Sequence, residues 1–195
     1  MKLYLVRHGE SENNLKGCYT GWADVSLTEK GVEDAKRIRS FFENKPVDKI
    51  YTSDLKRAKQ TAEAVIPDCV YEETPVIREI NVGDLSYKRF SDCEKIYGEE
   101  FKKNKAKINY APYGGESAEA FTDRVKQFLK ILEQSESECV VAFSHGGFLR
   151  ATLRYIIGHN ISSEVVKCTN CTIGVFEYKN GKWLFNSWIT PSELK

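Results

Sequence analysis

Short apolar runs alternate along the chain with longer stretches in which apolar residues recur every three or four positions. The first run, residues 3–6, is continuous, as in a strand that is covered on both faces. Similar runs of β-type residues, bounded by turn-forming residues, recur further along the chain. The strands expected from them are residues 3–6, 49–52, 69–71, 139–143, 171–178 and 182–189.

The stretches between these runs predict helices with one buried face. The positions at which helices are expected to begin are Thr28, Ser53 or Asp54, Ser117 and the residues behind His145. We expect Pro67 to end the second helix and the last one to run through about Ile157. The expected buried faces are Val32, Ala35, Ile38 and Phe42, then Leu55, Ala58, Ala62 and Val65, then Phe121, Val125, Phe128 and Leu132.

The alternation of strands and helices, followed by a terminal hairpin, predicts an α/β fold. Asn180 and Gly181 between the last two runs are typical of a tight hairpin turn. We expect a mostly parallel central sheet with an antiparallel edge and helices on both faces. No linker or repeat divides the chain, so residues 1–195 are expected to form one domain. Residues from about 80 to 113 lack a long apolar stripe and are expected to form a lid-like excursion of short helices and loops.

The composition is that of an ordinary soluble protein, with 41% hydrophobic and 29% charged residues. A net charge of +1 gives no reason to expect nucleic acid or an anionic membrane as a partner. No apolar run approaches the roughly 20 residues that a membrane-spanning helix requires, and the first residues lack a signal pattern. We therefore expect a cytoplasmic protein.

The 6 cysteines are dispersed, which does not favour a disulfide framework in a chain of this kind. Cys168 and Cys171 form a CxxC pair. A structural zinc site requires four ligands, and there is no second such pair. A redox CxxC normally opens a helix after a strand, whereas this one precedes a predicted strand. We expect no metal.

Two of the 3 histidines occupy the same local setting, because His8 and His145 each follow a predicted strand and precede a glycine. Residues just past the carboxyl ends of parallel strands converge on one crevice. A neutral imidazole there is a nucleophile, and we expect Gly9 to leave room for an approaching phosphorus atom. The pattern predicts phosphoryl transfer through a phosphorylated histidine. His159 is expected to be an exposed loop residue.

Cations and free backbone donors are expected beside the two imidazoles. Arg7 adjoins His8, and Arg57 lies one turn into a helix, off its apolar stripe. A guanidinium binds phosphate oxygens with two hydrogen bonds. The helix that begins behind His145 would turn its free N–H groups toward an anion. A solvated surface arginine and an incidental histidine at a helix cap are the alternatives.

Hydrolysis of a phosphate monoester requires up to about 10²¹-fold acceleration, whereas one acid or base supplies about 10²–10⁴. The remainder must come from positioning, charge neutralisation and a covalent intermediate. A nucleophile, several cations and one carboxylic acid meet that need without a metal ion.

Blocks of residues over nearly the whole chain carry a family resemblance. The blocks are residues 5–14, 20–31, 52–62, 78–84, 114–117 and 144–147. Through them the chain resembles the histidine phosphatase superfamily, which includes the cofactor-dependent phosphoglycerate mutases. The resemblance implies that His8 becomes phosphorylated and that Arg7, Arg57 and His145 complete the phosphate pocket.

The resemblance also implies roles that the residue pattern alone does not give. It implies lesser phosphate or substrate contacts for Asn14, Thr20, Gly21 and Gly146. It implies that Glu79, one of 28 acidic residues, donates a proton to the leaving oxygen. A surface carboxylate paired with Arg78 is the alternative for Glu79.

These roles suggest a mechanism. Two nearby arginines should disfavour protonation of His8, so that it stays a free base near neutral pH. We expect His8 to attack phosphorus while Glu79 protonates the leaving group. Water would then attack the phosphohistidine, with Glu79 as the base.

One segment departs from the family and one has an open role. After Gly83-Asp84 many members continue with tryptophan, glutamate and glycine, but residues 85–87 here are Leu-Ser-Tyr, on the substrate side of the pocket. The lysine-rich residues 102–107 are either a solvated helix face or a patch that attracts an anionic substrate. Tyr110 and Tyr113 either pack the lid or stack on a substrate ring.

We therefore expect a phosphomonoesterase that hydrolyses a small phosphorylated metabolite without a cofactor, in the style of α-ribazole phosphatase and broad-specificity members. A homodimer is left open. One alternative is a cofactor-dependent phosphoglycerate mutase, which would share the pocket residues. Another is a non-catalytic binding module on the same fold.

Overall fold

One six-stranded sheet forms the centre of the molecule. The computed structural model describes residues 1–158 and 166–194, so His159 lies outside the described residues. The strands are β1 (Lys2–Arg7), β2 (Lys49–Thr52), β3 (Glu72–Glu73), β4 (Cys139–Ser144), β5 (Ile173–Lys179) and β6 (Lys182–Ile189). They lie in the order β3-β2-β4-β1-β5-β6.

The sheet is mostly parallel with an antiparallel edge, as the sequence predicts. Strand β1 pairs in parallel with β4, which pairs in parallel with β2, while β5 and β6 run antiparallel. The turn between β5 and β6 uses Asn180 (φ 52°) and Gly181 (φ 74°). Positive φ at both central residues matches the twist of the flanking strands. The turn at Asn180 and Gly181 therefore explains the antiparallel pairing of β5 with β6.

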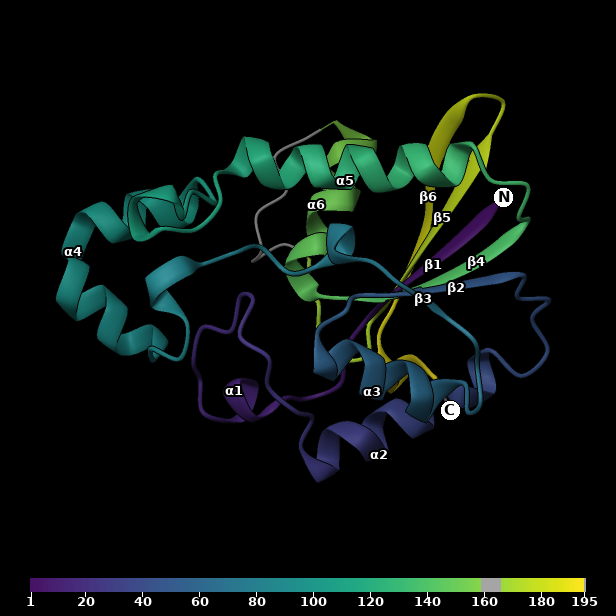
Figure 1. Cartoon of the computed structure of the whole chain (residues 1–195), viewed down its shortest axis with the longest axis horizontal. Helices are drawn as coiled ribbons and strands as arrows, with labels where there is room; N and C mark the ends of the chain where they lie inside the picture. The colour runs from purple at the N-terminus through teal and green to yellow at the C-terminus, as the bar shows by residue number, and fades with distance from the viewer. Residues whose placement is uncertain (159–165, 195) are drawn as a thin grey trace.

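Helices cover both faces of this sheet (Figure 1). They are α1 (Glu12–Leu15), α2 (Glu29–Arg37), α3 (Lys56–Val65), α4 (Phe90–Ala106), α5 (Ala118–Glu133) and α6 (Gly146–Ile157). Successive residues of β1 point to opposite faces, so Leu5 lies in one apolar cluster and Val6 in the other. Helices α5 and α6 pack on the first face, and α2 and α3 on the second.

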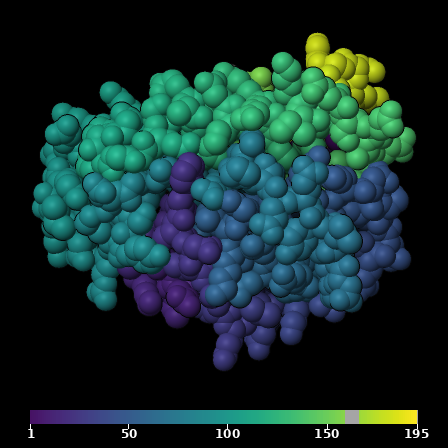
Figure 2. Space-filling view, viewed as in Figure 1, coloured from purple at the N-terminus to yellow at the C-terminus, as the bar shows by residue number. Residues whose placement is uncertain are grey.

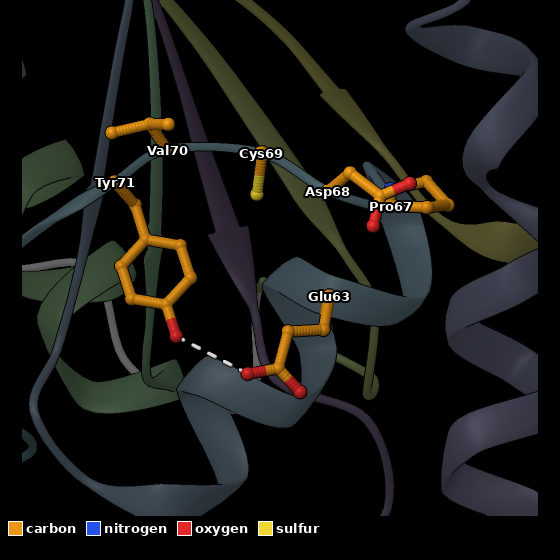
Figure 3. Close-up of a pocket in the computed structure, with 6 residues that line it drawn as sticks. All are labelled: Glu63, Pro67, Asp68, Cys69, Val70 and Tyr71. Atoms are coloured by element: carbon orange, nitrogen blue, oxygen red, sulfur yellow. Dashed lines mark hydrogen bonds between the residues drawn. The ribbon is translucent and has the colours of Figure 1, made fainter.

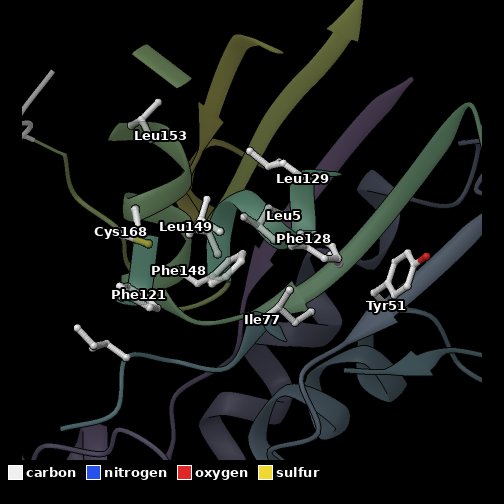
Figure 4. Packing of buried hydrophobic residues seen from close by; sticks show 14 of the residues in the cluster. Leu5, Tyr51, Ile77, Phe121, Phe128, Leu129, Phe148, Leu149, Leu153 and Cys168 are labelled. Atoms are coloured by element: carbon white, nitrogen blue, oxygen red, sulfur yellow. The ribbon is translucent and has the colours of Figure 1, made fainter. Parts of the chain in front are cut away.

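The predicted face residues are buried or partly buried, although Ile38 and Phe42 lie beyond the end of α2 and Leu55 precedes α3. Phe128 of α5 packs edge to face on Phe148 of α6, with the ring centroids 6.0 Å apart (Figure 4). Thr28 and Ser117 are the residues whose side chains cap α2 and α5. None of the helices in the described ranges is long and apolar enough to cross a membrane.

Two local predictions are wrong. The third strand is Glu72–Glu73 and not residues 69–71. Val70 is 92% exposed, because residues 69–71 follow the turn after α3 and do not pair with β2, which bonds only to Glu72 and Glu73 in this region. The residue that caps α3 is Leu55, and neither Ser53 nor Asp54 takes that place. The hydroxyl of Ser53 faces His145 instead.

The segment from residue 80 to 113 contains a longer helix than expected. Helix α4 extends over 17 residues, but Gly98 (φ 62°, ψ −146°) breaks it into two shorter pieces. Tyr113 packs on Tyr97 and Phe101, with centroid distances of 5.1 and 5.8 Å. Tyr110 is also buried. Both tyrosines therefore pack against other residues of this segment, which fits the alternative in which they pack the lid.

The amino-terminal loops join this segment to the body of the molecule. The backbone of Tyr19 exchanges hydrogen bonds with Lys88 and Tyr87, and Phe90 N–H donates to Gly17. Figure 2 shows amino-terminal residues at the surface between the α4 segment and the region around α3. The segment therefore lies against the loops that follow β1.

The two cysteines of the CxxC pair lie in different apolar clusters. Cys168 belongs to the cluster under α5 and α6, and Cys171 to the cluster under α2 and α3. All six cysteines are free thiols. Because the two clusters are on opposite faces of the sheet, Cys168 and Cys171 are separate packing residues and not a dithiol pair.

Candidate active site

The carboxyl ends of three neighbouring parallel strands supply the centre of the site. His8 follows β1, His145 follows β4 and Ser53 follows β2. The exposed fractions of these residues are 4%, 0% and 0%. The ring centroids of His8 and His145 lie 5.2 Å apart, with an angle of 62° between the ring planes. Two imidazoles separated by most of the sequence therefore face each other.

Hydrogen bonds determine the tautomer of His8. Its Nδ1 lies 2.7 Å from the carbonyl oxygen of Gly9, and its Nε2 lies 3.3 Å from Nε of Arg57. A carbonyl only accepts and a guanidinium only donates. The proton is therefore on Nδ1, and Nε2 carries the lone pair that a nucleophile needs.

Burial keeps this imidazole neutral. It lowers the pKa of His8 well below the usual value, and the charges of Arg57 and Arg7 lower it further. The sequence pattern predicted the effect of the arginines but not the larger effect of burial. A neutral His8 over the whole physiological range follows.

Arg57 is held rigidly in the first turn of α3 and is only 1% exposed. Its Nη1 donates to the carbonyl of Ala23 and its Nη2 to that of Gly21, both at 2.8 Å. Burial lowers the pKa of Arg57 to about 10, which still leaves it charged at neutral pH. The alternative of a solvated surface arginine does not fit this burial.

Arg7 and His145 each present a buried nitrogen without a hydrogen-bond partner among the described residues: Nε of Arg7 and Nδ1 of His145. Nη1 of Arg7 donates to the carbonyl of Cys168. A Cβ on Gly146 would approach Nε of Arg7 to 3.2 Å. Buried polar groups are nearly always paired, and these two lie beside the buried His8. This is the arrangement that an oxyanion would complete.

Glu79 lies at the first turn of α6. Its Oε2 accepts a hydrogen bond from Gly147 N–H at 3.1 Å, and its Oε1 accepts one from Ile80 N–H at 2.9 Å. A Cβ on Gly147 would come within 2.0 Å of that Oε1, so a side chain at this position would displace the Glu79 carboxylate. Arg78 pairs with Asp54 rather than with Glu79, which removes the alternative of a Glu79–Arg78 surface pair.

Three of the residues predicted to make lesser contacts also hold the loops of the site. Oδ1 of Asn14 accepts from Ser11 N–H and from Nδ2 of Asn170, each at 3.1 Å. The carbonyl of Thr20 accepts from Ala23 N–H at 2.9 Å, closing the turn that contains Gly21. Gly21 (φ 50°) has no room for a side chain against Val82.

Gly9 has a structural reason that the sequence pattern does not indicate. A Cβ on Gly9 would come within 2.4 Å of the carbonyl oxygen of Gly31 at the start of α2. The missing side chain therefore permits contact between the loop after β1 and α2.

Two further residues that build this site, Asn170 and Arg124, are not indicated by the sequence pattern. Asn170 donates from Nδ2 to the carbonyls of His8 and Gly9, at 3.1 and 2.9 Å. Arg124 donates to the carbonyl of Glu79 and forms a two-bond pair with Glu116. Each acts across the fold, so periodicity and local motifs give no signal for it.

A surface hollow lies away from these histidines. Its lining residues are Glu63, Pro67, Asp68, Cys69, Val70 and Tyr71 (Figure 3). It adjoins the end of α3 opposite to Arg57, and a helix of ten residues is about 15 Å long. Among the described residues no group of three or more histidine, cysteine or acidic side chains is placed to hold a metal ion.

The sheet, the buried imidazole pair and the two guanidiniums define an α/β enzyme that acts on a phosphoryl group. The family model described as histidine phosphatase superfamily (branch 1) matches residues 3–191. The chain belongs to this superfamily. The expected fold and the expected enzyme class, a phosphatase, are thereby confirmed.

Known phosphatases are similar to most of the chain. An adenosylcobalamin/α-ribazole phosphatase of Salmonella typhimurium is 35% identical over 76% of this chain and 76% of its own length. A metal-independent phosphoserine phosphatase of Arabidopsis thaliana is 33% identical over 99% of this chain and 83% of its own. The crystal structure of the α-ribazole phosphatase from Shigella flexneri superposes with a TM-score of 0.86 at 25% identity, covering 98% of this chain and 97% of that one.

A relative with a different name is also similar. Phosphoglycerate mutase-like protein 4 of Arabidopsis thaliana is 30% identical over 100% of this chain and 87% of its own length. Overall similarity therefore extends both to phosphatases and to a mutase-like protein, and it does not distinguish hydrolysis from mutase chemistry.

Proposed function

We propose that this protein is a metal-independent phosphomonoesterase in which Nε2 of His8 is the nucleophile. The observation that carries the proposal is the buried, neutral His8 with its lone pair on Nε2, 5.2 Å from the ring of His145. Arg7 and Arg57 beside it supply the positive charge that a metal ion would otherwise provide.

The reaction has two steps. Nε2 of His8 attacks phosphorus while Arg7, Arg57 and His145 hold the phosphoryl oxygens, and the carboxyl group of Glu79 gives its proton to the departing alcohol. A water molecule then attacks the phosphohistidine, Glu79 takes one proton from it, and His8 and inorganic phosphate are released. Each residue keeps one role apart from Glu79, which alternates between acid and base.

The substrate is a small phosphorylated metabolite that enters past residues 80–113. We propose that this segment is a lid within a single domain of residues 1–195. Residues 85–87, where the chain departs from the family pattern, contribute to the choice of leaving group. α-Ribazole phosphate and phosphoserine are the first compounds to try, because the similar phosphatases carry those names.

Hydrolysis is favoured over mutase chemistry by the compact segment between Glu79 and Gly114. The mutases that the chain resembles generally carry longer insertions there, which exclude water. A mutase would convert 3-phosphoglycerate to its isomer without net release of phosphate. We expect release of phosphate and no isomerisation.

The testing experiment is a phosphate-release screen with EDTA present and absent. The panel contains α-ribazole phosphate, phosphoserine, phosphoglycerates, sugar phosphates and nucleotides. We expect turnover of at least one compound, unchanged by EDTA, and a loss of about 10³-fold or more in His8→Ala. His159→Gln is the matched control, because it changes the third histidine. Loss of turnover in EDTA would contradict the metal-free mechanism, and full activity of His8→Ala would contradict the nucleophile.

A further inference from the structure

Ser53 is a buried hydroxyl that the mechanism above leaves without a role. It follows β2, beside the strand that carries His145, and is 0% exposed. Its Oγ lies 2.9 Å from Nε2 of His145 and accepts a hydrogen bond from Leu55 N–H at 3.4 Å. These are the hydrogen-bonding contacts of its hydroxyl group within the described part of the chain.

The direction of the Ser53–His145 bond follows from counting hydrogens. If Nε2–H of His145 donated to Ser53, the serine oxygen would accept from both neighbours and its own hydrogen would have no acceptor there. If Ser53 donates to Nε2, the serine hydrogen, its oxygen and Nε2 are all satisfied. Each arrangement leaves one buried donor without an acceptor among the described residues: the serine hydrogen in the first and Nδ1–H of His145 in the second. The first arrangement also leaves the lone pair of Nδ1 unpaired, so the second has fewer unsatisfied groups and is favoured.

The ring proton of His145 must then be on Nδ1. That atom is buried and has no partner among the described residues. With its proton it is a donor for an oxyanion, whereas in the other tautomer it would turn a lone pair toward negative charge. Burial, with Arg57 the next cause, holds the pKa of His145 well below its usual value, so a neutral ring must rely on its tautomer to donate.

We propose that Ser53 is a positioning residue that fixes the Nδ1–H tautomer of His145 and thereby makes it a hydrogen-bond donor to the phosphoryl group. The proposal rests on the proposed function for the identity of the anion. The tautomer itself is a property of the free protein. Ser53 thus acts on the reaction only through His145.

The direct test is a long-range ¹H–¹⁵N correlation spectrum of the imidazole nitrogens at neutral pH. His159→Gln leaves only the signals of His8 and His145. We expect both rings to show the Nδ1–H pattern in this background. In Ser53→Ala we expect His145 to change to the Nε2–H pattern or to a mixture, while His8 stays unchanged as an internal standard.

Kinetics give an independent readout. Loss of one preorganised donor costs about 10²–10³ in kcat, and a ring still free to adopt either tautomer should lose about 10- to 100-fold. Inhibition by inorganic phosphate should weaken in parallel. Thr52→Val is the matched control, because the hydroxyl of Thr52 is equally buried but donates to the carbonyl of Ser53 and touches neither histidine.

A second variant separates positioning from packing. Ser53→Thr keeps the hydroxyl and should restore the Nδ1–H pattern and most of the activity, with thermal unfolding used to confirm that each variant is folded. An Nε2–H pattern for His145 in the wild type, or an unchanged Nδ1–H pattern in folded Ser53→Ala, would overturn the proposal. Absence of any phosphatase turnover would overturn the proposed function instead, and would leave the tautomer result standing.

Discussion

At the residue scale, burial is the main cause of the chemistry at this site. It lowers the pKa values of His8 and His145 more than any neighbouring charge does. The carbonyl of Gly9 and the guanidinium of Arg57 then leave His8 with a lone pair on Nε2. A histidine that is neutral because it is buried away from water stays neutral over a wide pH range.

The depressed pKa values predict how stability depends on pH. The unfolded chain takes up protons on these histidines as the pH falls below 6.5, the ordinary value, while the folded chain does not until well below it. Their contribution to stability is therefore full above pH 6.5 and falls as the pH decreases, by about 1 kcal/mol per pH unit for each histidine. Urea unfolding at pH 7.5 and 5.5 measures this, and folded His8→Asn should show a shallower dependence than the wild type. Equal slopes would contradict it.

A second residue-scale prediction concerns the leaving group. Glu79→Gln cannot donate a proton, so kcat/KM, which reports the phosphorylation step and not the later attack of water, should fall by about 10²–10⁴ for alkyl phosphates. The fall should be much smaller for p-nitrophenyl phosphate, whose leaving group needs no acid. Glu119→Gln is the control, because it removes an exposed carboxylate in the first turn of α5. The same loss for both substrates would show that Glu79 does not act as the acid.

At the element scale, α5 holds the segment that carries Glu79. Arg124 of α5 donates to the carbonyls of Val76, Arg78 and Glu79 and pairs with Glu116 through two bonds. Residues 76–79, which form no part of the sheet, are thereby fixed against α5. The sequence shows only an arginine on an amphipathic helix, because its partners lie across a loop.

Arg124→Lys should therefore weaken both stability and proton donation. A lysine cannot reproduce the fork of the guanidinium, so we expect a loss of about 1–3 kcal/mol in the free energy of unfolding. Activity should fall more for alkyl phosphates than for p-nitrophenyl phosphate, as in Glu79→Gln. Lys126→Ala, which removes an exposed pair with Asp123 on the same helix, is the control. An unaltered leaving-group dependence in Arg124→Lys would separate this network from catalysis.

At the scale of the whole molecule, one end of the sheet carries the site and α4 extends beyond it (Figure 1). The lysine-rich face of α4 is partly neutralised, since Lys102 pairs with Glu99 and Lys105 with Glu94. These side chains are exposed, so that salt screens them over about 8–10 Å. The structure therefore favours a solvated helix face over a patch that attracts an anionic substrate.

Replacement of the four lysines within residues 102–107 should leave the activity of the enzyme nearly unchanged. The variant Lys102→Gln, Lys103→Gln, Lys105→Gln and Lys107→Gln should keep kcat/KM within about twofold, because exposed, screened charges contribute little. The measurement is kcat/KM between low and physiological salt. A steep loss confined to low salt would restore the role of substrate attraction.

The local pattern of residues is enough to predict most of the sheet, its antiparallel edge, the buried faces of α2, α3 and α5, and the two imidazoles at strand ends. These follow from period and turn chemistry, which act over a few neighbouring residues. Long-range contacts in the folded protein set the position of β3, the break in α4 at Gly98, and the partners of Ser53, Arg124 and Asn170. Those features depend on which hydrogen bonds remain to be satisfied once distant segments are buried together, and a linear pattern does not contain that information.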